Sequence, residues 1–172
     1  MSWFSVDCES DGPCPPLYSL VCFGAVKIDD KLDKTFYGQT EPISNDYQSE
    51  ALAISGFSRK EHNEFFDPEQ VFKNFKYWIE EVTIDRPIMV SDNPAYDWQW
   101  INYYFHKYTG SNPFGFSARR IGDIYCGMMK DVKAPWKHKL RKTKHTHNPV
   151  DDAKGNAEAV LAMRDMGLKI KV

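Results

Sequence analysis

Hydrophobic and polar residues alternate with two different periods along this chain, and the changes of period mark its expected elements. Residues 2–10 and 17–28 are apolar runs with the composition of buried strands. After the polar residues 29–31, an alternating run at 34–39 predicts a third strand that pairs antiparallel with the second. Residues 41–66 show neither period and are predicted to be irregular.

Helical spacing follows from residue 67 onward. Asp67-Pro68 has the form of a helix cap and first position, and apolar residues recur at 71, 72, 75, 78, 79 and 82. A short apolar run at 86–91 predicts a strand, and Asn93-Pro94 begins a helix that reaches about residue 107. A short strand and a helix are expected between 120 and 130, and Asn148-Pro149 begins the last helix. This order predicts an α/β fold, with a mixed sheet between helices.

Composition is that of an ordinary globular protein and argues against a zinc-binding, a secreted or a membrane-spanning protein. The 172 residues carry a net charge of −2 and contain four cysteines, none in a CxxC pair or in a spacing typical of zinc sites. No signal peptide is recognised and no apolar stretch approaches 18 residues. We therefore expect one domain over residues 1–172, in a soluble cytoplasmic protein with no membrane contact.

Charge is distributed unevenly, because residues 130–144 contain seven Lys or Arg against the single acid Asp131. A run of like charges is most often a solvated loop, and a run beside a nucleic-acid site would neutralise phosphates. The sequence leaves both interpretations open.

Two acids, Asp7 and Glu9, stand at the end of the first apolar run. Their i, i+2 spacing places both side chains on one face of a strand. Neighbouring carboxylates repel each other, and a hard divalent cation between them would relieve that repulsion. The alternative is a strand end with two solvated acids.

Two helix starts add further acids. Asp97 lies in the first turn after Asn93-Pro94 and shares the apolar stripe of Ile101 and Phe105, so it is expected to point inward. Asp151 and Asp152 lie in the first turn of the last helix, just after His147. The alternative for each acid is a favourable interaction with the helix dipole.

In this order, the residues resemble the DEDDh group of 3′–5′ exonucleases, within the ribonuclease H-like superfamily. The resemblance covers the chain from Asp7 to the last helix. It implies a mixed five-stranded sheet with an antiparallel hairpin, flanked by helices. It also implies a general base at His147, with His145 as a weaker rival, and metal ligands at four acids: Asp7, Glu9, Asp97 and Asp152.

The resemblance further implies two-metal-ion hydrolysis of phosphodiester bonds with Mg²⁺ or Mn²⁺. The expected partner is RNA with a free 3′ end, single-stranded or as a 3′ overhang, and a homodimer is possible by analogy. Residues expected to touch the substrate are Ser10, Ile54, Phe57, Asn93, Lys142 and Lys144; for Ile54 and Phe57 a core position is the alternative. The competing functions are a DNA exonuclease, a non-catalytic nucleic-acid-binding module of the same fold, and an endonuclease or integrase.

Overall fold

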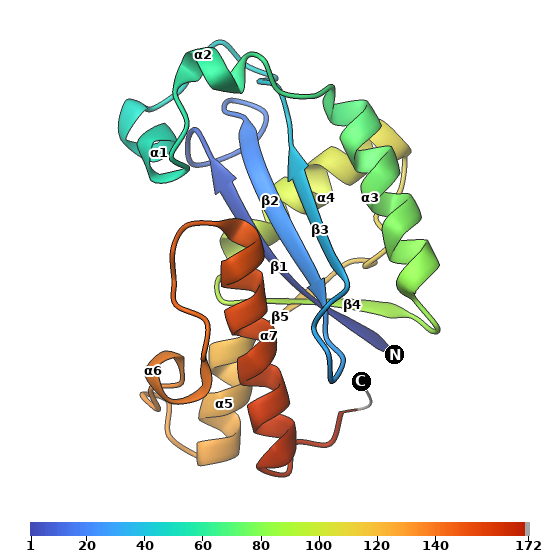
Figure 1. The fold of residues 1–172 in the computed structure, drawn as a ribbon, viewed down its shortest axis with the longest axis vertical. Coiled ribbons are helices and arrows are strands. Elements are labelled where there is room, and N and C mark those ends of the chain that lie inside the picture. The colour runs from blue at the N-terminus through green and yellow to red at the C-terminus, as the bar shows by residue number, and fades with distance from the viewer. Residues whose placement is uncertain (171–172) are drawn as a thin grey trace.

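Five strands form one mixed sheet in the computed structural model, which describes residues 1–170 (Figure 1). The strand order is β3-β2-β1-β4-β5. β1 pairs antiparallel with β2 and parallel with β4, and β5 continues the parallel side. The predicted mixed sheet and its antiparallel hairpin are thus confirmed. The strands are β1 (Ser2–Ser10), β2 (Leu20–Lys27), β3 (Thr35–Gln39), β4 (Pro87–Ser91) and β5 (Ala118–Arg120).

Helices cover both faces of this sheet. In Figure 1, α7 crosses in front of the sheet and α4 lies behind it. One hydrophobic core contains residues of α3 and α4, and a second contains residues of α5 and α7. The helices are α1 (Ser49–Ile54), α2 (Arg59–His62), α3 (Pro68–Val82), α4 (Pro94–Thr109), α5 (Ile121–Met129), α6 (Lys137–Leu140) and α7 (Pro149–Asp165).

The central strand β1 is buried on both faces. Phe4, Val6 and Cys8 pack in the core with α3 and α4, whereas Trp3 packs in the core with α5 and α7. Side chains alternate along a strand, so Asp7 and Glu9 share the face of Trp3. The two acids therefore point toward α7.

α7 begins very close to the sheet, at a glycine of β2. Gly24 pairs in register with Asp7. A Cβ atom on Gly24 would collide with the backbone of Pro149 and Val150, the first two residues of α7. The missing side chain at Gly24 thus lets the first turn of α7 lie beside Asp7.

Three details differ from the sequence prediction. Residues 41–66 contain the two short helices α1 and α2, and β2 begins at Leu20 rather than at residue 17. The basic stretch contains α6, and its Trp136 is buried in the second core.

None of the helices within residues 1–170 is long and apolar enough to cross a membrane.

We predict that Gly24→Ala destabilises the protein by about 1–3 kcal/mol, because the new methyl group forces the start of α7 away from β2. The matched control is Gly127→Ala in α5, where a Cβ atom meets nothing within 4 Å and where alanine favours a helix by up to about 1 kcal/mol. Urea unfolding measures both variants. Equal stability of Gly24→Ala and wild type would show that the close approach is not tight.

Candidate active site

Three of the four predicted acids line one open depression at the end of β1. Asp7, Glu9 and Asp97 meet there with His147, in a space of about 410 Å³. Asp152 lies beneath, with 1% of its surface exposed, and accepts a hydrogen bond from the backbone N–H of His147 at 2.9 Å. The fold therefore gathers the predicted acids and the predicted base from β1, α4, α7 and the loop before α7.

Asp97 is held by the backbone of β1. Its Oδ1 accepts a hydrogen bond from the N–H of Cys8 at 3.0 Å, beyond the last parallel pair of β1 with β4 at Ser5 and Val90. The carboxylate of Asp97 thus takes the place of a further β4 residue as a hydrogen-bond partner of β1. The pKa of Asp97 is raised to about 7, first by burial and then by the charges of Asp92 and Glu9, while the hydrogen bond from the Cys8 N–H lowers it.

Asp152 has the most partners of the four acids. Its Oδ1 lies 2.8 Å from Nη2 of Arg141 and 2.8 Å from Nδ1 of His145, and the N–H of Thr146 donates to it at 3.3 Å. Asn148 caps α7 by accepting hydrogen bonds from the N–H groups of Val150 and Asp151. The cap places Asp152 in the first turn, where the positive end of the helix dipole favours a carboxylate.

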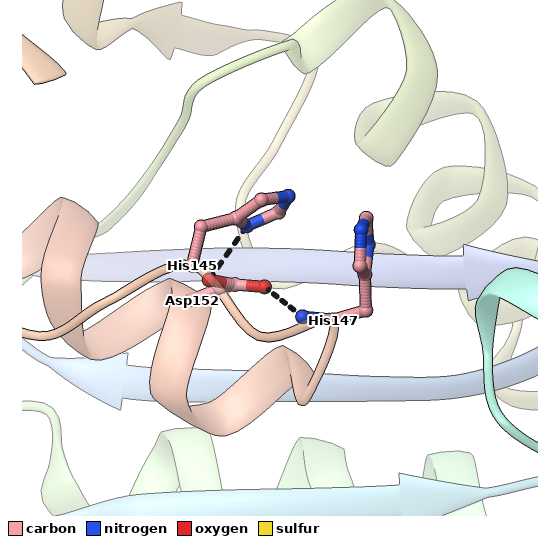
Figure 2. A group of neighbouring side chains, drawn as sticks. All are labelled: His145, His147 and Asp152. Carbon is pink, nitrogen blue, oxygen red and sulfur yellow. Dashed lines mark hydrogen bonds and ion pairs between the residues drawn. The ribbon is translucent and has the colours of Figure 1, made fainter.

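Figure 2 shows both histidines in contact with Asp152, His145 through its ring and His147 through its backbone N–H, and the centroids of the two rings are 4.3 Å apart. The His147 backbone has a φ of +60°, a left-handed conformation that costs a non-glycine residue roughly 1–2 kcal/mol. Its ring remains half exposed, with Nδ1 3.4 Å from Oε1 of Glu9. His145 reaches Asp152 and not Glu9 through its Nδ1. Both histidines line the depression, and of the two it is His147 that contacts an acid of β1.

Asp7 is the least compensated acid. Within residues 1–170, no hydrogen-bond donor reaches its carboxylate. Its pKa is raised well above the ordinary value, first by burial and then by the charges of Asp97, Asp152 and Glu9, while the charge of Arg141 lowers it. Clustered carboxylate oxygens without donors suit a divalent cation, so the residues present fit such an ion. His145, His147 and Asp152 also bring three possible ligand atoms within 4.8 Å of one another.

The six predicted substrate residues divide into three groups. Ile54, half exposed at the end of α1, and Asn93 line the depression with the acids. Lys142 and Lys144 line an adjoining depression of about 430 Å³, which also contains Lys137, His138 and Arg141. Both basic side chains are exposed, as phosphate binding requires.

Ser10 and Phe57 are placed differently from the prediction. Ser10 is buried, and its hydroxyl group is 2.6 Å from the carbonyl oxygen of Gly12 and 2.5 Å from the hydroxyl of Tyr96. The ring of Phe57 packs edge-on against Phe65, with centroids 4.9 Å apart, in a small core beneath α1. Neither side chain lines the depression, so the structure does not bring these two residues together with the acids, and Phe57 takes the core position that was its alternative.

A family model shows the family of this chain: the Rv2179c-like 3′-5′ exoribonuclease domain matches residues 3–164. The chain belongs to this family. It is a 3′–5′ exonuclease, and the family depends on divalent metal ions in general. A relative from Escherichia coli, the 3′-5′ DNA exonuclease Cap18, is 39% identical over 127 residues, which cover 72% of this chain and 67% of the relative.

Solved structures share the ribonuclease H-like fold. The nuclease domain of 3′hExo, a DEDDh family member bound to rAMP, has a TM-score of 0.76 and 16% identity; the match covers 99% of this chain and 94% of that one. Exonuclease I of E. coli with a dT13 oligonucleotide has a TM-score of 0.68 and 15% identity, covering 96% of this chain and 41% of that one. These likenesses show the fold of this exonuclease and support the predicted fold class.

Two contacts of the exonuclease site are not indicated by any pattern in the sequence. Tyr96 fixes Ser10 at the end of β1, and Arg141 pairs with Asp152. Tyr96 carried no signal beyond its place next to Asp97. Arg141 was one of seven basic residues in a stretch without a period, and only the folded chain separates it from the exposed lysines beside it.

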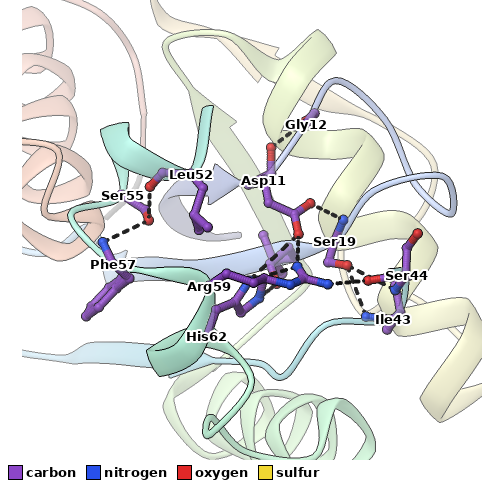
Figure 3. A network of polar contacts seen from close by, with 12 residues as sticks. Asp11, Gly12, Ser19, Ile43, Ser44, Leu52, Ser55, Phe57, Arg59 and His62 are labelled. Atoms are coloured by element: carbon purple, nitrogen blue, oxygen red, sulfur yellow. Dashed lines mark hydrogen bonds and ion pairs between the residues drawn. The ribbon is translucent and has the colours of Figure 1, made fainter. Parts of the chain in front are cut away.

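A buried network fixes α2, which follows α1 in the 41–66 segment, to Asp11, the residue that follows β1 (Figure 3). The Asp11 carboxylate is fully buried and pairs with Nη1 of Arg59 at 2.7 Å, and the N–H of Ser19 donates to it. Nη2 of Arg59 also donates to the carbonyl oxygen of Ser44. The fully buried ring of His62 lies 3.7 Å from Asp11. The network thus anchors the 41–66 segment at the rim of the site.

We predict that Asp7→Asn stabilises the metal-free exonuclease, because it removes a buried charge that three neighbouring acids repel. The same variant should lose cleavage and most of the rise in melting temperature that Mn²⁺ gives to wild type. Thermal unfolding with EDTA and with Mn²⁺ measures both effects. A variant with a lower metal-free melting temperature and an intact Mn²⁺ response would contradict this view of Asp7.

We also predict that His62 stays neutral through the physiological range. Burial, followed by the charge of Arg59, lowers the pKa of His62 to about 4. Because this value lies below that of an unfolded histidine, about 6.5, the contribution of His62 to stability is present above pH 6.5 and is lost as the pH falls toward 4. Proton NMR should show its ring signals unchanged from pH 8 to 5.5. A titration midpoint above 6 would contradict the prediction.

Proposed function

We propose that this exonuclease removes nucleotides from the 3′ end of RNA with two divalent ions, Mg²⁺ or Mn²⁺, bound by Asp7, Glu9, Asp97 and Asp152. The observation that carries the proposal is the meeting of these four acids with His147 around one open depression. Bound ions of this kind activate a water molecule and stabilise the leaving oxygen of a phosphodiester.

His147 is the proposed general base. It lies on a loop, its ring is half exposed, and its Nδ1 faces Glu9 at 3.4 Å. Glu9 can hold a proton on Nδ1, which leaves Nε2 as the nitrogen that accepts the proton of the attacking water. Asp152 supports this arrangement through the backbone N–H of His147.

The substrate strand is proposed to end beside Ile54 and Asn93. Ile54 offers an exposed apolar surface against which a base can pack without regard to sequence. Asn93 makes no capping hydrogen bond to α4, so its amide can bind the nucleotide instead. Lys142 and Lys144 are proposed to contact phosphates farther along the strand.

RNA and DNA remain two candidate substrates, each with its own support. The description of the family as an exoribonuclease domain favours RNA. The name of the E. coli relative, a DNA exonuclease, favours DNA as the second candidate. The homodimer and the cytoplasmic location stay predictions.

The test uses 5′-labelled RNA and DNA of one sequence, single-stranded or with a 3′ overhang, incubated with Mg²⁺, Mn²⁺ or EDTA. We expect a metal-dependent ladder that shortens from the 3′ end, fastest on RNA. Internal cuts would indicate an endonuclease, and binding without cleavage would indicate a non-catalytic module. Faster cleavage of DNA would overturn the choice of RNA.

We predict that His147→Ala lowers the cleavage rate by about 10²–10⁴-fold, as expected for the loss of a general base. Stabilisation by Mn²⁺ should persist, because His147 is not a proposed metal ligand. His106→Ala, which changes an exposed histidine of α4, is the matched control and should cleave like wild type. Single-turnover kinetics measure the rates, and an unchanged rate for His147→Ala would move the role of base to His145.

A further inference from the structure

The side chain of Arg141 contacts one of the acids, Asp152, and is mostly covered by the rest of the protein. Arg141 follows α6, and its side chain is only 8% exposed. Its Nη2 donates to Oδ1 of Asp152 at 2.8 Å, and its Nη1 donates to Oδ1 of Asn156 at 3.4 Å. Such a charge-assisted contact restricts the direction in which the Asp152 carboxylate points.

α7 provides a seat shaped for this guanidinium group. Asp152 and Asn156 are four residues apart and share one face of the helix, with Gly155 between them on the same side. A Cβ atom on Gly155 would collide with the guanidinium group. Glycine inside a helix costs about 1 kcal/mol relative to alanine. The seat for Arg141 explains why a glycine stands at this position.

The chain that carries Arg141 is fixed to the same helix. The carboxylate of Glu158 accepts hydrogen bonds from the N–H groups of Lys142 and Thr143, both at 2.7 Å, and from the Thr143 hydroxyl at 2.9 Å. Glu158 lies on the helix beyond Asn156, so the segment runs along α7. Arg141 is therefore anchored by its backbone neighbours as well as by its side chain.

We propose that Arg141 is a positioning residue of the nuclease reaction, which acts through Asp152. One oxygen of Asp152 is held by Arg141, and the other accepts the backbone N–H of His147. The carboxylate thereby connects Arg141 to a proposed metal ligand and to the loop of the proposed base. Arg141 borders the basic depression, but its side chain is only 8% exposed and its guanidinium group is turned to α7, so we assign it to this connection and the exposed lysines beside it to the substrate.

The proposal rests on the proposed function, and its test is a cycle of Arg141→Gln, Gly155→Ala and the double variant. Each single variant should lower kcat by about 10–100-fold, the usual effect of losing a partner of a metal ligand, with little change in KM. The double variant should be no slower than Arg141→Gln, because both changes disturb one contact. Controls are Arg164→Gln, which removes an ion-paired arginine from the far end of α7, and Gly127→Ala.

Two measurements do not depend on cleavage. In the Arg141→Gln background, Gly155→Ala should raise the free energy of unfolding, whereas in wild type it should lower it. Binding of Mn²⁺, followed by electron paramagnetic resonance, should change in both single variants and not in the controls.

Several results would overturn the proposal. The proposal is wrong if either single variant keeps the kcat and the Mn²⁺ binding of wild type. It is also wrong if the losses of kcat in the two single variants add up in the double variant. An increase confined to KM would make Arg141 a substrate contact. If wild type cleaves no substrate, the proposed function fails, whereas the unfolding cycle and Mn²⁺ binding still decide the role of Arg141.

Discussion

Mutual repulsion of four carboxylates is the constraint around which this structure is organised. Burial and neighbouring charges raise the pKa of Asp7, Glu9 and Asp97. The fold offsets part of this cost with fixed donors: the Cys8 N–H for Asp97, and the His147 N–H with Arg141 for Asp152. No such donor reaches Asp7 from the described residues 1–170. The remaining deficit of positive charge is the feature that fits this site to the divalent cations that we propose for it.

Backbone geometry makes the gathering of these acids possible. The alternation of β1 places Asp7 and Glu9 on the face that α7 covers, and Gly24 lets α7 begin against the neighbouring strand. The closeness of Asp152 to Asp7 therefore depends on the missing side chain of Gly24 as much as on the acids themselves. A larger residue at position 24 would separate Asp152 from Asp7 without touching either.

Local patterns predict most of the site, because each acid lies next to a strong local signal. Strand alternation assigns Asp7 and Glu9 to one face, and Asn-Pro helix starts place Asp97 and Asp152 in first turns. Ser10, Phe57 and Arg141 depend on contacts distant in sequence. Ser10 meets Tyr96, Phe57 packs in the small core that contains Val21 and Cys22 of β2, and Arg141 lies over Gly155. No period in the chain encodes such partners, and the same is true of the short helices α1 and α2.

The helices α4 and α7 begin with the same sequence pattern, but different contacts fix their first turns. Both read Asn-Pro-x-x-Asp, at residues 93–97 and 148–152, and both aim a carboxylate from a first turn into the site. Asn148 caps its helix with its side chain, whereas Asn93 forms no such bond. Asp97 is instead fixed by the Cys8 N–H, so α4 is anchored by its acid rather than by its cap. The amide of Asn93 is thereby left at the surface of the depression. An uncapped helix start costs up to about 1–2 kcal/mol, and the contact with substrate that we propose for the Asn93 amide accounts for that cost.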